Sequence, residues 1–158
     1  TRGFFEPEVD LTVGRRWAPR EATLTVAGRA GAVLGDAPTQ ALFPFGGRGT
    51  VPGYGFRGFA GERFVTLSAT ASAYLWRPWV RGRLLGAIGR VGRDDSDLTC
   101  PANASCPPAL GGSGWKPSLG IGVGLVNDIL RVDLSRGLAA DGRWEVVVDA
   151  NPSFWDFL

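Results

Sequence analysis

Few side chains in this sequence have the chemistry for covalent or metal-dependent catalysis. The 158 residues include no histidine, two cysteines and a single lysine, Lys116, among 17 basic residues. Ser-His-Asp triads, Cys-His pairs and the usual zinc sites need imidazole groups or additional thiolates. We therefore expect no catalytic residue, no metal site and no cofactor, and we do not expect the chain to be an enzyme.

The two cysteines are suited to a structural cross-link. Cys100 and Cys106 flank the sequence Pro-Ala-Asn-Ala-Ser, in a region rich in Gly, Pro and polar residues. Disulfides persist in exported proteins, and one that closes so short a loop restricts the unfolded chain only modestly. The spacing predicts a local disulfide between Cys100 and Cys106.

Charge and hydropathy exclude two further classes. The net charge is only +2, and the arginines are spread among acidic residues along the chain, so we expect no nucleic-acid partner. No segment approaches the roughly 20 consecutive apolar residues of a transmembrane helix, so any membrane role must use strands. Because the sequence begins at Thr1 without a signal-like apolar stretch, we expect a piece of a longer or processed chain.

Apolar and polar residues alternate along most of the chain, which is the pattern of β-strands. The clearest example runs from Val65 to Trp76, where Val, Leu and Ala alternate with Thr, Ser and aromatic residues. The periodicity predicts an all-β fold, an antiparallel meander of about seven long strands. The expected strands cover residues 4–17, 21–34, 63–76, 80–91, 117–126, 129–138 and 143–154.

The links between these strands alternate in length. Short turns are expected at 17–21, 77–79 and 127–128, and longer Gly- and Pro-rich links at 35–62, 92–116 and 138–143. Short turns on one side, long loops on the other and strands of about 9–11 residues are typical of outer-membrane β-barrels. We therefore predict that residues 1–158 form the C-terminal part of a transmembrane β-barrel domain.

One face of the predicted sheet is apolar, whereas the other carries charges of both signs, as a barrel lumen does. A soluble β-sandwich or lipocalin-like barrel also alternates, but it would turn its apolar face toward a buried core. Gly120, Gly122 and Gly124 share the charged face and leave room for an inserted loop. The charges expected in the lumen are Asp10, Arg81, Arg83, Arg131, Asp133 and Asp149, together with Glu8 and Glu145.

Aromatic residues gather near the predicted strand ends. Such residues form the girdles at the two membrane interfaces of a barrel. The candidates are Trp17, Tyr74, Trp76, Trp79, Trp115, Trp144, Phe154 and Trp155.

The loop at 35–62 carries the residues that suggest a family. It contains the pair Gly46-Gly47, then Val51-Pro52-Gly53-Tyr54 and Phe56-Arg57-Gly58-Phe59. These resemble the long outer loop of the bacterial surface antigen superfamily, which includes BamA- and TamA-like assembly proteins and secretion pores. In that family a Gly-Gly pair precedes a Val-Arg-Gly-Phe/Tyr motif, and five strands then complete a sixteen-stranded barrel. Five strands are also predicted after the loop here.

Two positions depart from the family pattern. Spacing from Gly46-Gly47 places Pro52 where the family has its arginine. In the family an aspartate in a Phe-x-Asp-x-Gly stretch holds this arginine, and the matching stretch here, Leu85-Gly86-Ala87-Ile88-Gly89, has Ala87 at the aspartate position. Arg57 is a shifted arginine that would need another counter-ion if it is buried. The alternative is that the loop lies in or over the barrel without this ion pair. Candidate counter-ions for Arg57 are Asp10, Asp133 and Asp149.

The resemblance implies a function at the bacterial outer membrane, namely insertion or translocation of proteins. It implies contact with outer-membrane lipid and with client outer-membrane proteins or periplasmic assembly partners. Two alternatives are a barrel that anchors or exports an upstream hydrolase and a passive porin-like channel.

Overall fold

A computed structural model describes residues 4–18, 21–35, 42–92, 114–126 and 128–150, which contain strands and turns and no helix. None of these residues therefore belongs to a helix long and apolar enough to cross a membrane. Seven strands form one antiparallel sheet in the order β11-β10-β9-β8-β7-β3-β2, which confirms the predicted meander. They are β2 (Glu8–Trp17), β3 (Ala22–Ala32), β7 (Arg63–Trp76), β8 (Val80–Gly92), β9 (Lys116–Leu125), β10 (Leu130–Gly137) and β11 (Trp144–Ala150).

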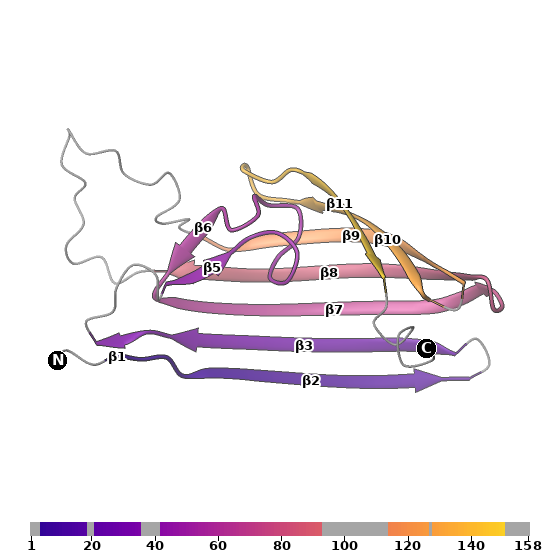
Figure 1. Cartoon of the computed structure of the whole chain (residues 1–158), viewed down its shortest axis with the longest axis horizontal. Helices are drawn as coiled ribbons and strands as arrows, with labels where there is room; N and C mark the ends of the chain where they lie inside the picture. The colour runs from indigo at the N-terminus through magenta and orange to yellow at the C-terminus, as the bar shows by residue number, and fades with distance from the viewer. Residues whose placement is uncertain (1–3, 19–20, 36–41, 93–113, 127, 151–158) are drawn as a thin grey trace.

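The connections alternate as the sequence predicts. The chain passes from β2 to β3, from β7 to β8 and from β9 to β10 at one end of the sheet, and between the other consecutive strands at the opposite end (Figure 1). Every neighbouring pair of strands is antiparallel, so odd and even links fall at opposite ends.

The first predicted strand, 4–17, is wrong as a single element. It divides into β1 (Phe4–Phe5), which pairs with β4 (Leu34–Gly35), and the long strand β2. Pro7 lies at the break, where it has no backbone N–H to donate, although its carbonyl accepts the amide of Ala32 at 3.2 Å. The predicted end of the last strand, 151–154, lies outside the described residues.

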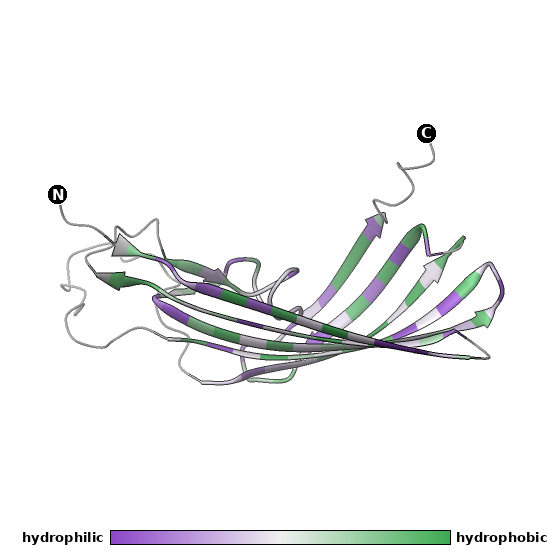
Figure 2. Ribbon diagram, turned by 90° about the horizontal axis from the view of Figure 1, so that it is seen from below, coloured by the Kyte–Doolittle hydropathy of each residue, from purple (hydrophilic) through white to green (hydrophobic). Residues whose placement is uncertain are grey.

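The two faces of the seven-stranded sheet differ in chemistry. Leu67 lies opposite Ile88, and Leu84 opposite Ile121, so apolar side chains of adjacent strands lie side by side. Figure 2 shows the alternation along each strand. We call this surface the apolar face; its well-exposed members include Val9, Leu11, Val13, Leu84, Leu119, Ile121, Val146 and Val148. The polar face carries Asp10, Arg29, Ser68, Thr70, Arg81, Arg83, Ser118, Arg131, Asp133, Ser135, Glu145 and Asp149.

Aromatic residues lie at both ends of the apolar face. Trp17 and Trp79 are exposed at the end with the short turns, and Trp115 and Trp144 are exposed at the other end. Phe154 and Trp155 lie outside the described residues.

Tyr74 differs from the other aromatic residues. It lies opposite Arg81 on the polar face, and the Arg81 guanidinium stacks over its ring at 4.9 Å, so its predicted place in a girdle is wrong. A register shift after Tyr74 pairs Trp76 with Val80, which turns Trp76 to the apolar face.

The buried core lies on the polar face, beneath residues 42–62, which we call the inserted segment. Its strands β5 (Phe43–Phe45) and β6 (Phe59–Gly61) pair as a hairpin, and the loop between them lies against the sheet (Figure 1). The core joins residues of the inserted segment to residues of β7 and β8. Its buried members are Phe45, Val51, Tyr54, Phe64 and Val91.

Candidate functional site

The candidate site is the contact between the inserted segment and the polar face. The segment turns sharply at Gly46-Gly47, where both glycines have positive φ, +108° and +78°. The Gly46 amide donates to Thr50 Oγ1 at 2.8 Å, and the Gly47 amide donates to the Val51 carbonyl at 3.0 Å. Because these bonds close the turn, residues 51–54 are directed onto the sheet.

Tyr54 is the deepest anchor of the segment. Its side chain is fully buried, its hydroxyl donates to the Pro117 carbonyl at 2.6 Å, and the Ala139 amide donates to that hydroxyl at 3.2 Å. The ring packs edge-on to Phe59, with centroids 6.3 Å apart. Lys116 lies over both rings and pairs with Asp141 at 2.6 Å. Tyr54 therefore ties the segment to the loop ends of β9 and β10.

Gly53 allows the backbone of the segment to touch the backbone of the sheet. Its φ is +85°, and a Cβ at this position would overlap Gly137. The Gly53 amide donates to Glu145 Oε2 at 2.6 Å, and the Arg143 amide donates to the Gly53 carbonyl at 2.8 Å. Of the predicted loop residues, Val51, Gly53 and Tyr54 therefore make the contact, together with Phe59.

Arg57 does not enter the sheet. Its side chain is exposed and stacks over Phe56 at 5.3 Å, and it forms no ion pair with any residue that the structure describes. The neighbouring Gly58 and Phe59 lead into β6, where Phe59 packs against the core. The three candidate counter-ions pair elsewhere: Asp10 with Arg29 at 3.3 Å, Asp133 with Arg83 at 3.1 Å and Asp149 with Arg48 at 2.7 Å.

Arg48 is a functional candidate that sequence reasoning missed. It follows the Gly46-Gly47 pair, and its guanidinium reaches Asp149 on β11. With the Gly53–Glu145 bond, this pair gives the inserted segment two contacts with the last described strand. The only sequence signal was the Gly-Gly-Arg order, because the partner strand lies far along the chain.

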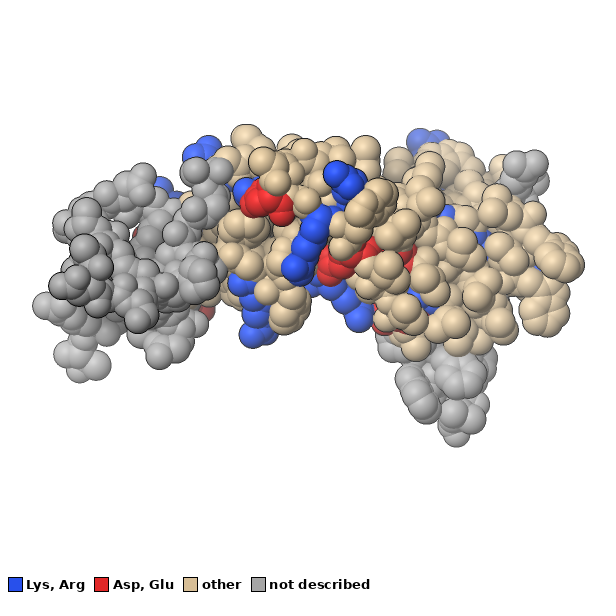
Figure 3. All heavy atoms as spheres, turned by 90° about the horizontal axis from the view of Figure 1, so that it is seen from above, with Lys and Arg blue, Asp and Glu red and all other residues tan. Residues whose placement is uncertain are grey.

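Charged residues of the polar face form a half-buried cluster on β8 and β10. Arg83 contacts Asp133 at 3.1 Å and Asp128 at 3.9 Å, and Arg131 donates to Asp128 at 2.6 Å. These side chains are 13–26% exposed. Figure 3 shows basic and acidic side chains beside one another rather than in separate patches. Asp128 lies in a turn, so the alternation of the strands did not point to it.

Arg81 joins three strands across the same face. Its guanidinium donates to Ser72 Oγ at 3.0 Å on β7, to Thr23 Oγ1 at 3.0 Å on β3 and to the Glu21 carbonyl at 3.1 Å. The six charges predicted on one face thus all lie there, and each has a partner.

The glycines of β9 make room mainly for carboxylates. A Cβ at Gly122 would overlap Asp133, and a Cβ at Gly124 would overlap Asp128. The sequence predicted instead that these glycines accommodate an inserted loop. The inserted segment lies over Gly89 and Gly137. A Cβ added at Gly89 would lie 2.8 Å from Phe45, and one added at Gly137 would lie 2.8 Å from Tyr54.

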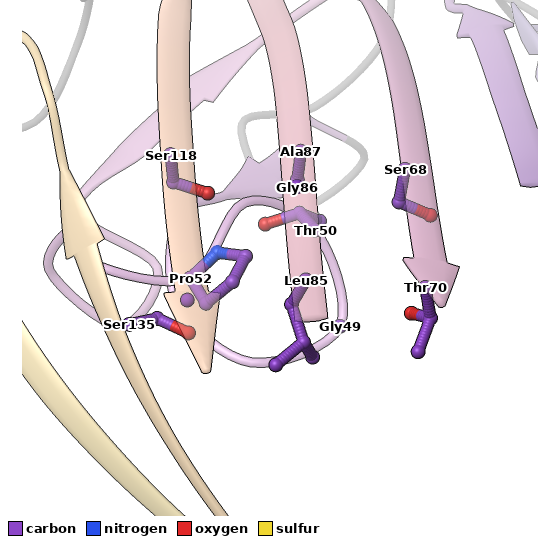
Figure 4. Close-up of a pocket in the computed structure, with 11 residues that line it drawn as sticks. Gly49, Thr50, Pro52, Ser68, Thr70, Leu85, Gly86, Ala87, Ser118 and Ser135 are labelled. Carbon is purple, nitrogen blue, oxygen red and sulfur yellow. The ribbon is translucent and has the colours of Figure 1, made fainter. Parts of the chain in front are cut away.

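A cavity of about 210 Å³ separates the tip of the inserted segment from the polar face (Figure 4). Pro52 of the segment and Ala87 of β8 both line it. The remaining wall is rich in hydroxyl groups, and we call it the hydroxyl cavity. These hydroxyls belong to Thr50, Ser68, Thr70, Ser118 and Ser135.

The predicted disulfide between Cys100 and Cys106 lies outside the described residues. Within the ranges that are described, no group of carboxylates or thiols is placed to hold a metal ion. A scan of the sequence against protein-family models finds no match, and a search of curated proteins finds none either.

Proposed function

We propose that this chain is the C-terminal part of an outer-membrane β-barrel of the bacterial surface antigen superfamily. We propose further that the complete barrel inserts or translocates proteins at that membrane. The observation that carries the proposal is that Pro52 and Ala87 line one cavity.

Pro52 and Ala87 were selected from the family's motifs alone, as the positions of an arginine and the aspartate that holds it. They are distant in sequence, yet both face the space between the inserted segment and β8. A family loop that has lost this ion pair would leave such a cavity, since two large side chains have been replaced by smaller ones. Tyr54, at the aromatic position of the same motif, is fully buried.

The apolar face supports the membrane part of the proposal. The outward residues of β8 from Val80 to Ile88 are apolar or glycine, and Arg90 follows. The eight residue steps of about 3.4 Å from Val80 to Ile88, at a strand tilt near 40°, span about 21 Å, which compares with the ~25 Å apolar band of outer-membrane barrels. Soluble monomers rarely expose an apolar patch of this extent.

The inserted segment argues against an open passive channel. It packs on the polar face of β7 and β8 and contacts β9, β10 and β11 through Tyr54, Gly53 and Glu145. A barrel that contains it would be partly filled, as a gated secretion or assembly pore is.

Arginine substitutions on the two faces test the membrane placement. Ile121→Arg should reduce the amount of folded, heat-modifiable parent protein in the outer-membrane fraction, because arginine at mid-bilayer depth costs about 2–4 kcal/mol. Thr25→Arg, exposed on the polar face, is the matched control and should insert normally. A parent protein that is soluble without detergent and tolerates Ile121→Arg contradicts the proposal.

Depletion of the parent protein tests the function separately. We expect lower amounts of other outer-membrane proteins or loss of one secreted protein. Unchanged outer-membrane composition and secretion would overturn the assembly and translocation function while leaving the membrane placement intact.

A further inference from the structure

The hydroxyl cavity contains a buried polar group that lacks a partner. Ser118 is 3% exposed and lines the cavity, and its Oγ has no hydrogen-bond partner among the residues that the structure describes. A buried hydroxyl without a partner is costly, so such a group needs a water or another bound molecule that completes the bond. Figure 4 shows the hydroxyls of Ser118, Thr50 and Ser135 around the Pro52 ring.

The lining also defines the chemistry of that molecule. None of the residues around the cavity, all within the described part of the chain, is charged. An ion would therefore lose its hydration without gaining a counter-ion, which is unfavourable for either sign. Hydroxyl groups both donate and accept, so they match a ligand that itself carries several hydroxyls.

We propose that the hydroxyl cavity binds a small neutral polyhydroxyl compound, on the scale of glycerol or a single sugar. Its volume of about 210 Å³ corresponds to roughly seven water molecules of about 30 Å³ each. The ligand would contact Thr50 on the inserted segment and Ser118 and Ser135 on β9 and β10. It would therefore add a bridge between the segment and the sheet to the direct contacts of Tyr54, Gly53 and Arg48.

The inference is independent of the membrane function and is tested on the purified full chain, in detergent where required. Glycerol and glucose serve as probes in saturation-transfer NMR and in thermal unfolding. Both should show saturable binding and raise the unfolding temperature. Gluconate and glucosamine, which carry a charge, should bind more weakly than glucose.

Variants locate the binding. Ala87→Leu fills the cavity and should abolish binding, and Ser118→Ala should weaken it about three- to tenfold through loss of one hydrogen bond. Ser118→Ala also provides the test if Ala87→Leu fails to fold. Thr66→Val removes a buried hydroxyl on the same strand as Ser68 but outside the cavity, and it should bind as wild type does.

Two outcomes overturn the inference. If neither glycerol nor glucose binds, the cavity holds water only. If both probes bind Ser118→Ala and Ala87→Leu as they bind the wild type, they bind elsewhere. Neither outcome affects fractionation of the parent protein with the membrane, so the two proposals fail separately.

Discussion

The two halves of the sheet differ in how much of their structure is self-contained. Strands β7 to β11 meet most of the inserted segment, and the buried residues Phe64, Val91, Ser118 and Ser135 lie in this half. The segment reaches the other half at the end of β3, where the Val33 amide donates to the Glu62 carbonyl at 2.6 Å. Strand β2 is exposed along its whole length and is held to β3 by backbone pairing and the Arg29 ion pairs. The covered half therefore carries its own core, whereas β2 and β3 depend on neighbouring strands for stability.

The largest loss of stability in the covered half is expected for Tyr54→Ala. Removing this fully buried ring should destabilise the covered half by about 3–5 kcal/mol, as large aromatic truncations do. Urea unfolding and protease cleavage within 42–62 measure the effect. Val13→Ala on β2, where the side chain is 60% exposed, is the control and should change stability by less than about 0.5 kcal/mol. Equal effects of the two changes would contradict the contrast.

A double-mutant cycle at Pro52 and Ala87 tests whether these two positions of the covered half interact across the hydroxyl cavity. Pro52→Arg and Ala87→Asp should each destabilise the chain, because each places one uncompensated charge in the cavity. Together they should recover about 0.5–3 kcal/mol as a favourable coupling energy, since the two charges can pair. Additive effects in urea unfolding would show that the two positions do not meet.

Removing a charge from the cluster on β8 and β10 should destabilise the chain more than removing one from the ion pairs between β2 and β3. Arg83→Ala leaves Asp133 without its ion-pair partner, whereas Asp128 keeps Arg131, and at 13–16% exposure about 2 kcal/mol is expected, between surface and fully buried values. Asp10→Ala, at a 57% exposed site on β2, should cost less than about 1 kcal/mol. Thermal unfolding of both variants tests the order.

The smallest effects are expected for the two arginines of the inserted segment. Arg48→Ala removes an exposed ion pair with Asp149 and should cost less than about 1 kcal/mol. Arg57→Ala should be nearly neutral, because its side chain is exposed and rests only on Phe56. Protease resistance of 42–62 measures both, and a strong loss with Arg57→Ala would show that this arginine is buried after all.

The strands and their faces were predictable because alternation is a local signal. The alternation of apolar and polar residues around Val65 and Leu119 predicted the strands β7 and β9 and the face of the sheet on which each residue lies. The same alternation in the other strands placed the charged residues on one face. The break at Pro7 and the bulge after Tyr74 were missed because a single residue interrupts an otherwise regular pattern.

The interior of the inserted segment was beyond the reach of periodicity. Its glycine-rich residues do not alternate, and its position depends on contacts with distant residues, such as Tyr54 with Pro117 and Gly53 with Glu145. Family spacing selected Val51, Gly53 and Tyr54, but only the fold separates them from Arg57. Arg48 and Asp128 lie in turns, where no pattern marks a side chain as paired.

Asp133 occupies the space that a side chain at position 122 would need, and this constrains which substitutions the chain can accept in evolution. A side chain at 122 requires the carboxylate to move, whereas loss of the carboxylate first leaves the half-buried Arg83 with a weaker partner. Neither single step is neutral, so the glycine, the acid and the arginine should be inherited as a set. We expect descendants of this chain to keep all three or to replace them together.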